Sequence, residues 1–207
     1  HSGSRGDEAG SSIVSFALDR AMMVMGAVAL RGRTALILGA GAMSSLAATQ
    51  AGRLGVDKLI IANRTFDRAE RLAGHAMEAG VQAEAIDFAD RARVLADVDL
   101  AISATGAQDF TLTKDDIPAG HNLMMVDLSL PRDIDDAVME HEGVTLINIE
   151  RLSNSLEAAD TEVAGGTDPQ VAARKIVREE LEAYSSAQRV REVVPAVAAL
   201  RRRAADV

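Results

Sequence analysis

The chain has 207 residues, 48% of them hydrophobic and 26% charged, which is enough for one full globular domain and an appendage. It contains no cysteine, so disulfides, thiolate metal sites and a cysteine nucleophile are excluded within these residues. Aromatic residues make up only 2%, which argues against a stacking surface for single-stranded nucleic acid. No apolar run has the length of a transmembrane helix, and the first residues do not resemble a signal peptide, so we expect a cytoplasmic protein with no membrane contact.

The net charge of −9 is unevenly distributed along the chain. Residues 172–207 carry eight Lys or Arg against five Asp or Glu, a local charge of +3, so the remainder carries −12. A basic tail of this kind either contacts a polyanion or forms the solvated face of a helix. The solvated face is the simpler interpretation.

The pattern along the chain predicts an α/β fold. In the leading segment, residues 1–30, we expect a helix at roughly Ser12–Ala29 with Ser11 or Ser12 as its N-cap. Six short apolar runs follow, at Thr34–Leu38, Lys58–Ala62, Ala83–Ile86, Leu100–Ser103, Leu123–Asp127 and Thr145–Asn148. Helix-like stretches such as Ala42–Leu54 and Asp67–Ala79 separate them. Strands alternating with helices predict βαβ units and hence a doubly wound parallel sheet of the Rossmann type.

The C-terminal part has a different composition. Residues 158–169, AADTEVAGGTDP, are small, acidic and rich in glycine, and predict a flexible linker. Residues 170–188 return to a helical pattern, and Pro195 interrupts or kinks the remaining residues. We therefore divide the chain into a Rossmann domain at 1–157, the linker, and a helical segment at 170–207 that we expect to have little to pack against.

A glycine-rich turn follows the first predicted strand and opens a predicted helix. It consists of Gly39, Ala40, Gly41, Ala42, Met43 and Ser44. Gly39 permits a tight turn, Gly41 permits a close backbone approach, and the amides of Ala42 and Met43 lie at a helix N-terminus, which attracts a pyrophosphate. Ser44 stands where a third Gly or Ala is usual. The alternative is a glycine turn kept only for packing.

The second strand ends in Asn63-Arg64-Thr65, where an NAD site places an acid against the adenine ribose. A guanidinium pairs instead with the 2′-phosphate that distinguishes NADP from NAD. We therefore expect Arg64 to bind this phosphate, with Thr65 capping the next helix and Arg68 as a second clamp, and we expect NADP(H) rather than NAD(H). The alternative is that Arg64 is a surface residue paired with Asp67 or Glu70.

Three longer motifs, in this order, are similar to those of bacterial glutamyl-tRNA reductases: IIANRTFDRAERLA (60–73), LAISATGAQ (100–108) and VDLSLPRDID (126–135). The opening GSSIVSFALDRA (10–21) and the closing residues 176–204 resemble the same family. Shikimate dehydrogenases share NRT but differ at the ATG and DLSLPRD segments. The resemblance therefore favours glutamyl-tRNA reductase.

The resemblance implies NADPH-dependent reduction of glutamyl-tRNA(Glu) to glutamate-1-semialdehyde, the first committed step of tetrapyrrole (porphyrin and haem) synthesis. Members of the family have an N-terminal catalytic domain with a nucleophilic cysteine, a central NADPH domain, and a C-terminal dimerisation domain reached through a long helix. This chain departs from that pattern because it has no cysteine and because AGGTDP (164–169) interrupts the long helix. We therefore expect an NADPH-binding central portion, inactive alone, whose full-length form is a homodimer, and we expect residues 170–207 to be the helical start of its dimerisation domain.

The resemblance also assigns site residues. The loop from Gly39 to Ser44 and the triplet from Asn63 to Thr65 match the cofactor loop and the adenosine-phosphate end. The remaining matches are Ser103, Ala104, Thr105 and Gly106 along the ribose and nicotinamide, with Asp127 and Leu128 completing the nicotinamide end. Arg132 and Asp133 either face the missing catalytic domain or form an internal ion pair.

Two other functions remain open. One is a shikimate-type NADP-dependent dehydrogenase, and the other is a nucleotide-binding or dimerisation module without chemistry. The four histidines are scattered without metal-ligand spacing, so we assign no metal ligand and no catalytic residue within the chain.

Overall fold

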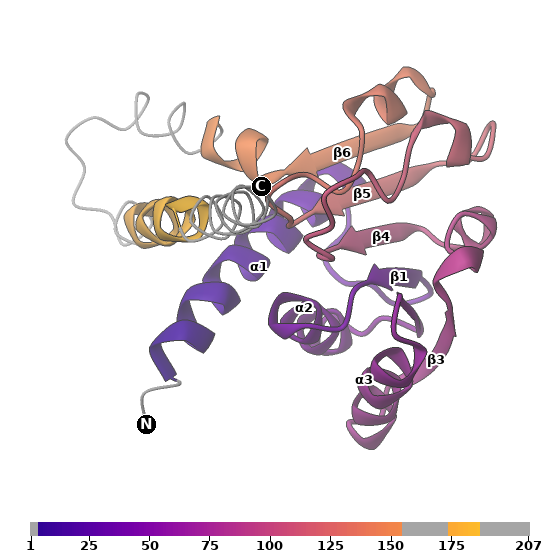
Figure 1. Cartoon of the computed structure of the whole chain (residues 1–207), viewed down its shortest axis with the longest axis horizontal. Helices are drawn as coiled ribbons and strands as arrows, with labels where there is room; N and C mark the ends of the chain where they lie inside the picture. The colour runs from indigo at the N-terminus through magenta and orange to yellow at the C-terminus, as the bar shows by residue number, and fades with distance from the viewer. Residues whose placement is uncertain (1–3, 155–173, 187–207) are drawn as a thin grey trace, which may run out of the picture.

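The computed structural model describes residues 4–154 and 174–186, and its centre is one six-stranded parallel sheet (Figure 1). The strands are β1 (Thr34–Leu38), β2 (Lys58–Asn63), β3 (Gln82–Asp87), β4 (Leu100–Ser103), β5 (Leu123–Asp127) and β6 (Val144–Asn148). Their order in the sheet is β3-β2-β1-β4-β5-β6. This order confirms the predicted Rossmann topology, in which the chain reverses direction across the sheet between β1 and β4.

Most strands read as nearly continuous apolar runs because both faces of the sheet are buried. The edge strand β3 is the exception, since exposed Gln82 and Glu84 alternate with its alanines. Successive side chains of a strand point to opposite faces. In β1, Ala35 and Ile37 therefore belong to one core cluster, whereas Leu36 and Leu38 belong to another on the opposite face.

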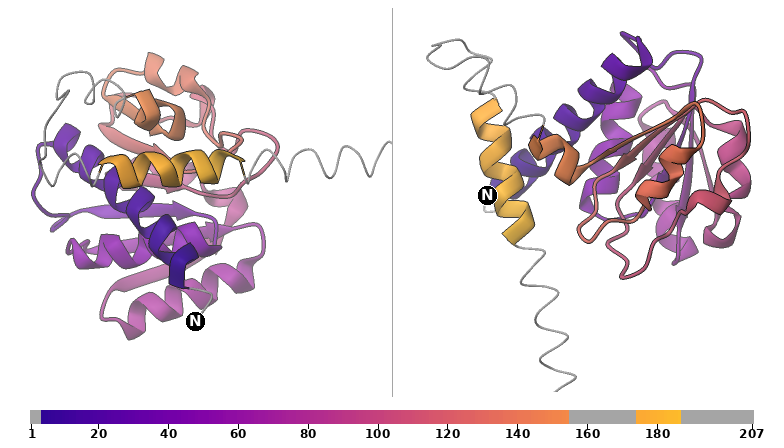
Figure 2. Two further views of the ribbon diagram at one scale, coloured as in Figure 1. Left: turned by 90° about the vertical axis from the view of Figure 1, so that its left-hand side faces the viewer. Right: turned by 90° about the horizontal axis from the view of Figure 1, so that it is seen from above.

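The two faces are covered differently (Figure 2). One face carries the long helices. The other carries loops and 3₁₀ helices such as η2 (Arg93–Asp97) and η4 (Asp136–Glu140), whose Val94, Leu95 and Val138 are buried against it. The long helices are α1 (Ser4–Met25), α2 (Ala42–Arg53) and α3 (Phe66–Glu78). The 3₁₀ helices are η1 (Phe88–Asp90), η2 (Arg93–Asp97), η3 (Lys114–Asp116) and η4 (Asp136–Glu140).

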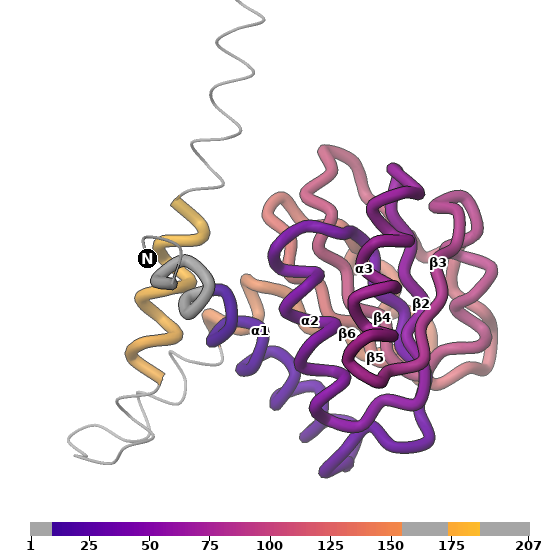
Figure 3. Tube along the Cα trace, turned by 90° about the horizontal axis from the view of Figure 1, so that it is seen from below, coloured from indigo at the N-terminus to yellow at the C-terminus, as the bar shows by residue number. Residues whose placement is uncertain are grey.

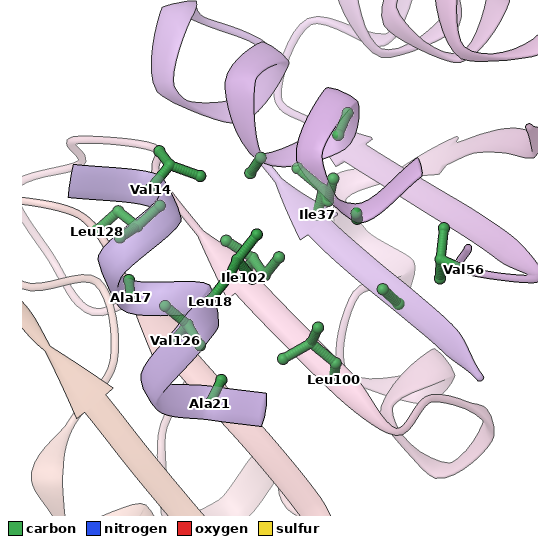
Figure 4. Close-up of a cluster of buried hydrophobic side chains, with 14 of the residues drawn as sticks. Val14, Ala17, Leu18, Ala21, Ile37, Val56, Leu100, Ile102, Val126 and Leu128 are labelled. Atoms are coloured by element: carbon green, nitrogen blue, oxygen red, sulfur yellow. The ribbon is translucent and has the colours of Figure 1, made fainter. Parts of the chain in front are cut away.

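Helix α1 differs from the prediction at both ends. It begins at Ser4, so the predicted caps Ser11 and Ser12 lie inside it. It ends at Met25 because Gly26 adopts a φ of 66° and donates its N–H to the Met23 carbonyl, a left-handed glycine stop. Its buried face packs on the centre of the sheet (Figure 4), where Val14, Ala17, Leu18 and Ala21 lie near Leu100, Ile102 and Val126.

The C-terminal helix at residues 174–186 packs against the domain, contrary to the expectation that it would have little to pack against (Figure 3). Val177 and Leu181 are buried and belong to the same core cluster as α1. The Tyr184 hydroxyl, one turn further along the helix, donates a hydrogen bond of 2.7 Å to the Leu128 carbonyl. The predicted linker at 158–169 lies outside the described residues.

Candidate functional site

The candidate site is the crevice at the carboxyl ends of the strands, where ligands bind in open α/β sheets. Backbone hydrogen bonds join three strand ends here. The Gly39 N–H donates to the Ala62 carbonyl at 2.8 Å, and the Ala104 N–H donates to the Leu38 carbonyl at 2.9 Å. The loops that follow β1, β2 and β4 therefore meet at one edge of the sheet.

Gly39 is required by the packing of the turn. Its φ is 107°, which L side chains rarely adopt. A Cβ placed on it would lie 2.6 Å from the Ala104 carbonyl oxygen and 2.7 Å from the Ser44 hydroxyl oxygen. The glycine turn and the loop after β4 are therefore in direct contact.

Gly41 has a different role. It is the N-cap of α2 with a φ of −86°, which any residue adopts, and a Cβ there would meet nothing within 4 Å. No side chain caps the helix, and Gly41 and Ala42 are exposed. The N–H groups of the first helical turn have no intrahelical partners, so the Ala42 and Met43 amides are free to bind an anion above Gly41.

Ser44, the predicted third small residue of the turn, is fully buried. Its hydroxyl lies 3.5 Å from the Ala104 carbonyl, at the long limit of a hydrogen bond. The position therefore joins α2 to the loop after β4 by packing.

The residues after β2 form an exposed polar turn. The Asn63 side-chain amide donates a hydrogen bond of 3.0 Å to the Thr65 carbonyl and fixes the turn. Thr65 occupies the N-cap position of α3, but its side chain makes no capping hydrogen bond, which corrects part of the prediction. Arg64, Thr65 and Arg68 are all exposed.

Phe88, the residue after β3, supports Arg64. The Arg64 guanidinium carbon lies 5.2 Å from the centroid of the Phe88 ring, and that of Arg91 lies 4.2 Å from it. Arg91 is committed to the fold, since its Nε donates to the Thr111 carbonyl at 2.7 Å. Across residues 4–154 and 174–186, Arg64 forms no ion pair, so the alternative pairing with Asp67 or Glu70 is absent there. Sequence reasoning missed Phe88, although a lone aromatic residue after the neighbouring strand was an available signal.

Asp127 ends β5 as a fully buried carboxyl group. One oxygen accepts from the Ser129 N–H at 2.9 Å, and the other accepts from the Asp133 and Ile134 N–H groups at 2.8 and 2.9 Å. Burial raises the pKa of Asp127 to about 7, and the nearby Asp133 acts in the same direction, whereas the three backbone donors lower it. Leu128 is buried as well, so neither residue exposes its side chain to the crevice.

Asp133 is fully buried beneath the loop after β4. One carboxylate oxygen accepts from the Ser103 hydroxyl at 2.6 Å, the Thr105 N–H at 2.8 Å and the Ser129 hydroxyl at 2.7 Å. The other accepts from the Thr105 hydroxyl at 2.7 Å. Asp133 thus does not face outward, and it forms no ion pair with residues 4–154 or 174–186. Sequence reasoning missed this arrangement.

Arg132, next to Asp133, forms the internal ion pair that was one of the two expectations for it. Its guanidinium donates to the Asp136 carboxylate at 2.7 Å.

Comparisons with known proteins agree with this geometry. The six-stranded order and the turn after β1 define the Rossmann class of α/β domains. Residues 20–155 match the family model described as shikimate/quinate 5-dehydrogenase, and residues 172–207 match the glutamyl-tRNA reductase dimerisation domain. The chain belongs to the shikimate/quinate 5-dehydrogenase family, and within it corresponds to part of a glutamyl-tRNA reductase.

The relatives support this assignment. The chain is 66% identical over its whole length to glutamyl-tRNA reductase of Corynebacterium aurimucosum and covers 46% of that protein, so it spans about half the length of the curated relatives it matches. The solved glutamyl-tRNA reductase of Methanopyrus kandleri matches with a TM-score of 0.59 and 27% identity, over 83% of this chain and 42% of that one. Shikimate 5-dehydrogenase of Listeria monocytogenes, solved with shikimate and NAD, shares the fold at a TM-score of 0.56 and 19% identity, over 80% of this chain and 62% of that one. The identity to glutamyl-tRNA reductase is thus much higher than the identity to shikimate 5-dehydrogenase. The alternative function of a shikimate-type dehydrogenase is therefore not favoured, although the family model is named after that enzyme.

No helix within residues 4–154 and 174–186 is long and apolar enough to cross a membrane. No group of three or more His, Cys, Asp or Glu side chains in this part could hold a metal ion.

Proposed function

We propose that the crevice binds NADP(H). The pyrophosphate lies at the N-terminus of α2 above Gly41, where the backbone is open and the amides of the first turn have no partner within the helix. The adenosine 2′-phosphate lies at Arg64 after β2. The nicotinamide half extends to the side of the glycine turn that is opposite to Arg64, along residues Ser103 to Gly106.

The observation that carries the choice of NADP(H) is the exposed guanidinium of Arg64. It follows β2 where an NAD site has an acid, it rests on the Phe88 ring, and it forms no ion pair in the described part of the chain. A guanidinium that is oriented by a ring but not neutralised is suited to a phosphate. Arg68, one turn into α3, adds positive charge to the same turn.

A titration with both cofactors tests this proposal. We expect NADPH to bind more tightly than NADH when the fluorescence of each is followed on addition of the chain. Equal affinities, or tighter binding of NADH, would overturn the assignment of Arg64 to a 2′-phosphate.

We also propose that the whole protein reduces glutamyl-tRNA(Glu) to glutamate-1-semialdehyde, as its relatives' name implies. NADPH supplies the hydride in this reaction. The 207 residues bind and orient it, but they contain no cysteine, so the thiol that attacks the glutamyl ester must come from outside them. The match of residues 172–207 to a dimerisation domain supports a homodimer.

An assay with glutamyl-tRNA tests this division of roles. We expect the 207-residue chain to bind NADPH and to release no semialdehyde. Semialdehyde formed by this chain alone would show that the chemistry does not need a cysteine.

A further inference from the structure

Asp133 is a carboxylate enclosed by the loops of the crevice. Its side chain accepts four hydrogen bonds of 2.6 to 2.8 Å, from Ser103, Thr105 and Ser129. Its own backbone is held as well, because its N–H donates to Asp127 and its carbonyl accepts from the Thr111 N–H at 2.7 Å. Burial of a carboxylate is costly unless its oxygens are satisfied, so this cluster is a specific arrangement and not a filler of space.

Ser129 extends the cluster to the end of the loop. Its hydroxyl donates to Asp133 at 2.7 Å and accepts from the Gly106 N–H at 3.2 Å. Asp133 therefore holds Ser103 and Thr105 directly and Gly106 through Ser129. Three of the four residues from Ser103 to Gly106 depend on one carboxylate.

The fourth residue, Ala104, connects this loop to the glycine turn. Its carbonyl oxygen lies where a Cβ on Gly39 would be only 2.6 Å away, and its N–H is bonded to Leu38. The glycine turn is itself held to β2 by the Gly39 N–H, so it limits how far the loop can move toward it.

The loop lies on one side of the switch point between β1 and β4, whereas Arg64 lies on the other side, after β2. A dinucleotide with its adenosine at Arg64 and its pyrophosphate at Gly41 must place its second nucleoside along residues 103–106. The Asp133 cluster thus lies beside the nicotinamide half of the ligand. The hydrogen bonds of the Asp133 side chain go to Ser103, Thr105 and Ser129, and not to the turn from Asn63 to Thr65.

We propose that Asp133 is a positioning residue that fixes residues 103–106 and so sets the affinity for the nicotinamide half of the cofactor. This inference rests on the proposed NADP(H) site. An asparagine in its place has one acceptor oxygen and one NH₂ group, so it cannot accept all four hydrogen bonds. The Thr105 N–H or its neighbours would lose a partner, and the loop would move.

The test compares NADPH with 2′,5′-ADP, which keeps the adenosine and 2′-phosphate but has no nicotinamide. For Asp133→Asn we expect NADPH affinity to fall about tenfold or more, corresponding to loss of at least one charge-assisted hydrogen bond. We expect 2′,5′-ADP affinity to stay within about twofold of the wild type, because Asp133 forms no hydrogen bond with residues 63–65 or 39–44, where its 2′- and 5′-phosphates would lie. A general loss of structure would weaken both ligands together.

Two other variants complete the design. Asp135→Asn, two residues away, removes a carboxylate that only accepts from the Ala137 N–H, and it should change neither affinity. Ser129→Ala removes the link to Gly106 and keeps Asp133, so it should weaken NADPH selectively even where Asp133→Asn does not fold. In the double variant, Ser129→Ala should weaken NADPH binding less than it does alone, because both substitutions act through one chain of hydrogen bonds.

The outcomes separate the two proposals. If the wild-type chain binds 2′,5′-ADP and NADPH, but Asp133→Asn and Ser129→Ala bind NADPH as the wild type does, the positioning role is overturned and the cofactor site stands. Equal losses for both ligands would also overturn it. A wild-type chain that binds neither ligand would overturn the cofactor site, and the positioning role with it.

Discussion

At the scale of single residues, the two glycines of the turn after β1 have separate physical reasons. Gly39 has a positive φ and no room for a Cβ, whereas Gly41 has an ordinary φ and open space beside it. The fold therefore requires the first glycine, and only a ligand above the helix N-terminus would require the second.

Gly39→Ala and Gly41→Ala should therefore fail in different ways. We expect Gly39→Ala to lower the free energy of unfolding by about 2–4 kcal/mol, from backbone strain and overlap with Ala104. Gly41→Ala should leave it within about 0.5 kcal/mol of the wild type but weaken NADPH binding. Urea unfolding and NADPH titration of both variants measure this, and unchanged NADPH affinity in Gly41→Ala would contradict the pyrophosphate position.

Arg64 determines the choice between the two cofactors in the proposed site. We expect Arg64→Gln to weaken NADPH by about tenfold to a hundredfold, as for a hydrogen-bonded charge pair, and to leave NADH nearly unchanged. Arg71→Gln is the matched control, because Arg71 is an exposed arginine of α3 that lies one turn beyond Arg68. Equal weakening of NADPH and NADH would mean that Arg64 does not bind the 2′-phosphate.

Asp127 gives the fold a dependence on pH. Its pKa in the folded chain, about 7, lies above the ordinary 3.8, so between these values the folded state holds a proton that the unfolded state has lost. Its contribution to stability is therefore fully present below about pH 4 and is lost as the pH rises through about 7. A ¹³C NMR titration should place the Asp127 carboxyl midpoint near 7, and lower in Asp133→Asn, where the second carboxylate is absent. A midpoint near the ordinary value in the wild type would contradict the effect of burial.

At the scale of elements, the helix at 174–186 is the part whose role changed most from the expectation. It carries apolar or aromatic residues at 177, 181 and 184, a helical spacing that makes one face. That face is buried against the domain, and Tyr184 reaches the carbonyl of Leu128 in the loop after β5. The segment that leads to residues 187–207 is thus attached directly beside the candidate site.

Leu181→Ala should loosen this helix. Leu181 is 2% exposed and Ile176 is 52% exposed, so the two residues form a matched pair on one element. We expect Leu181→Ala to cost about 2–4 kcal/mol and to speed amide hydrogen exchange in residues 174–186 at least about tenfold. Ile176→Ala should have little effect. Equal exchange rates in the two variants would show that the buried contact does not hold the helix.

At the scale of the whole molecule, the sheet gathers residues from distant parts of the chain at one edge. The loop after β1 supplies the proposed pyrophosphate position, the turn after β2 supplies Arg64, and the loops after β4 and β5 are joined by Asp133. The chain spans about half of the length of its relatives, and we propose that it provides the place for a hydride donor. The other half must provide the thiol in the function that we propose.

The sequence by itself determined the features that depend on neighbouring residues. The sequence pattern predicted all six strands to within two residues. Strands buried on both faces need apolar residues at nearly every position, and only the edge strand β3 alternates polar and apolar residues. The glycine turn and the triplet after β2 could also be recognised from the sequence, because turn geometry and charge are local properties. The family resemblance was carried by these same contiguous segments.

Only the tertiary structure decided the features whose partners lie far apart along the chain. Asp133 bonds to Ser103 across 30 residues, and Tyr184 bonds to Leu128 across 56. The same is true of Phe88 beneath Arg64 and of the buried face of the C-terminal helix. No local pattern marks a residue as the partner of one that only the folded sheet brings beside it, because the hydrogen bond or the packing exists only after the strands have been ordered.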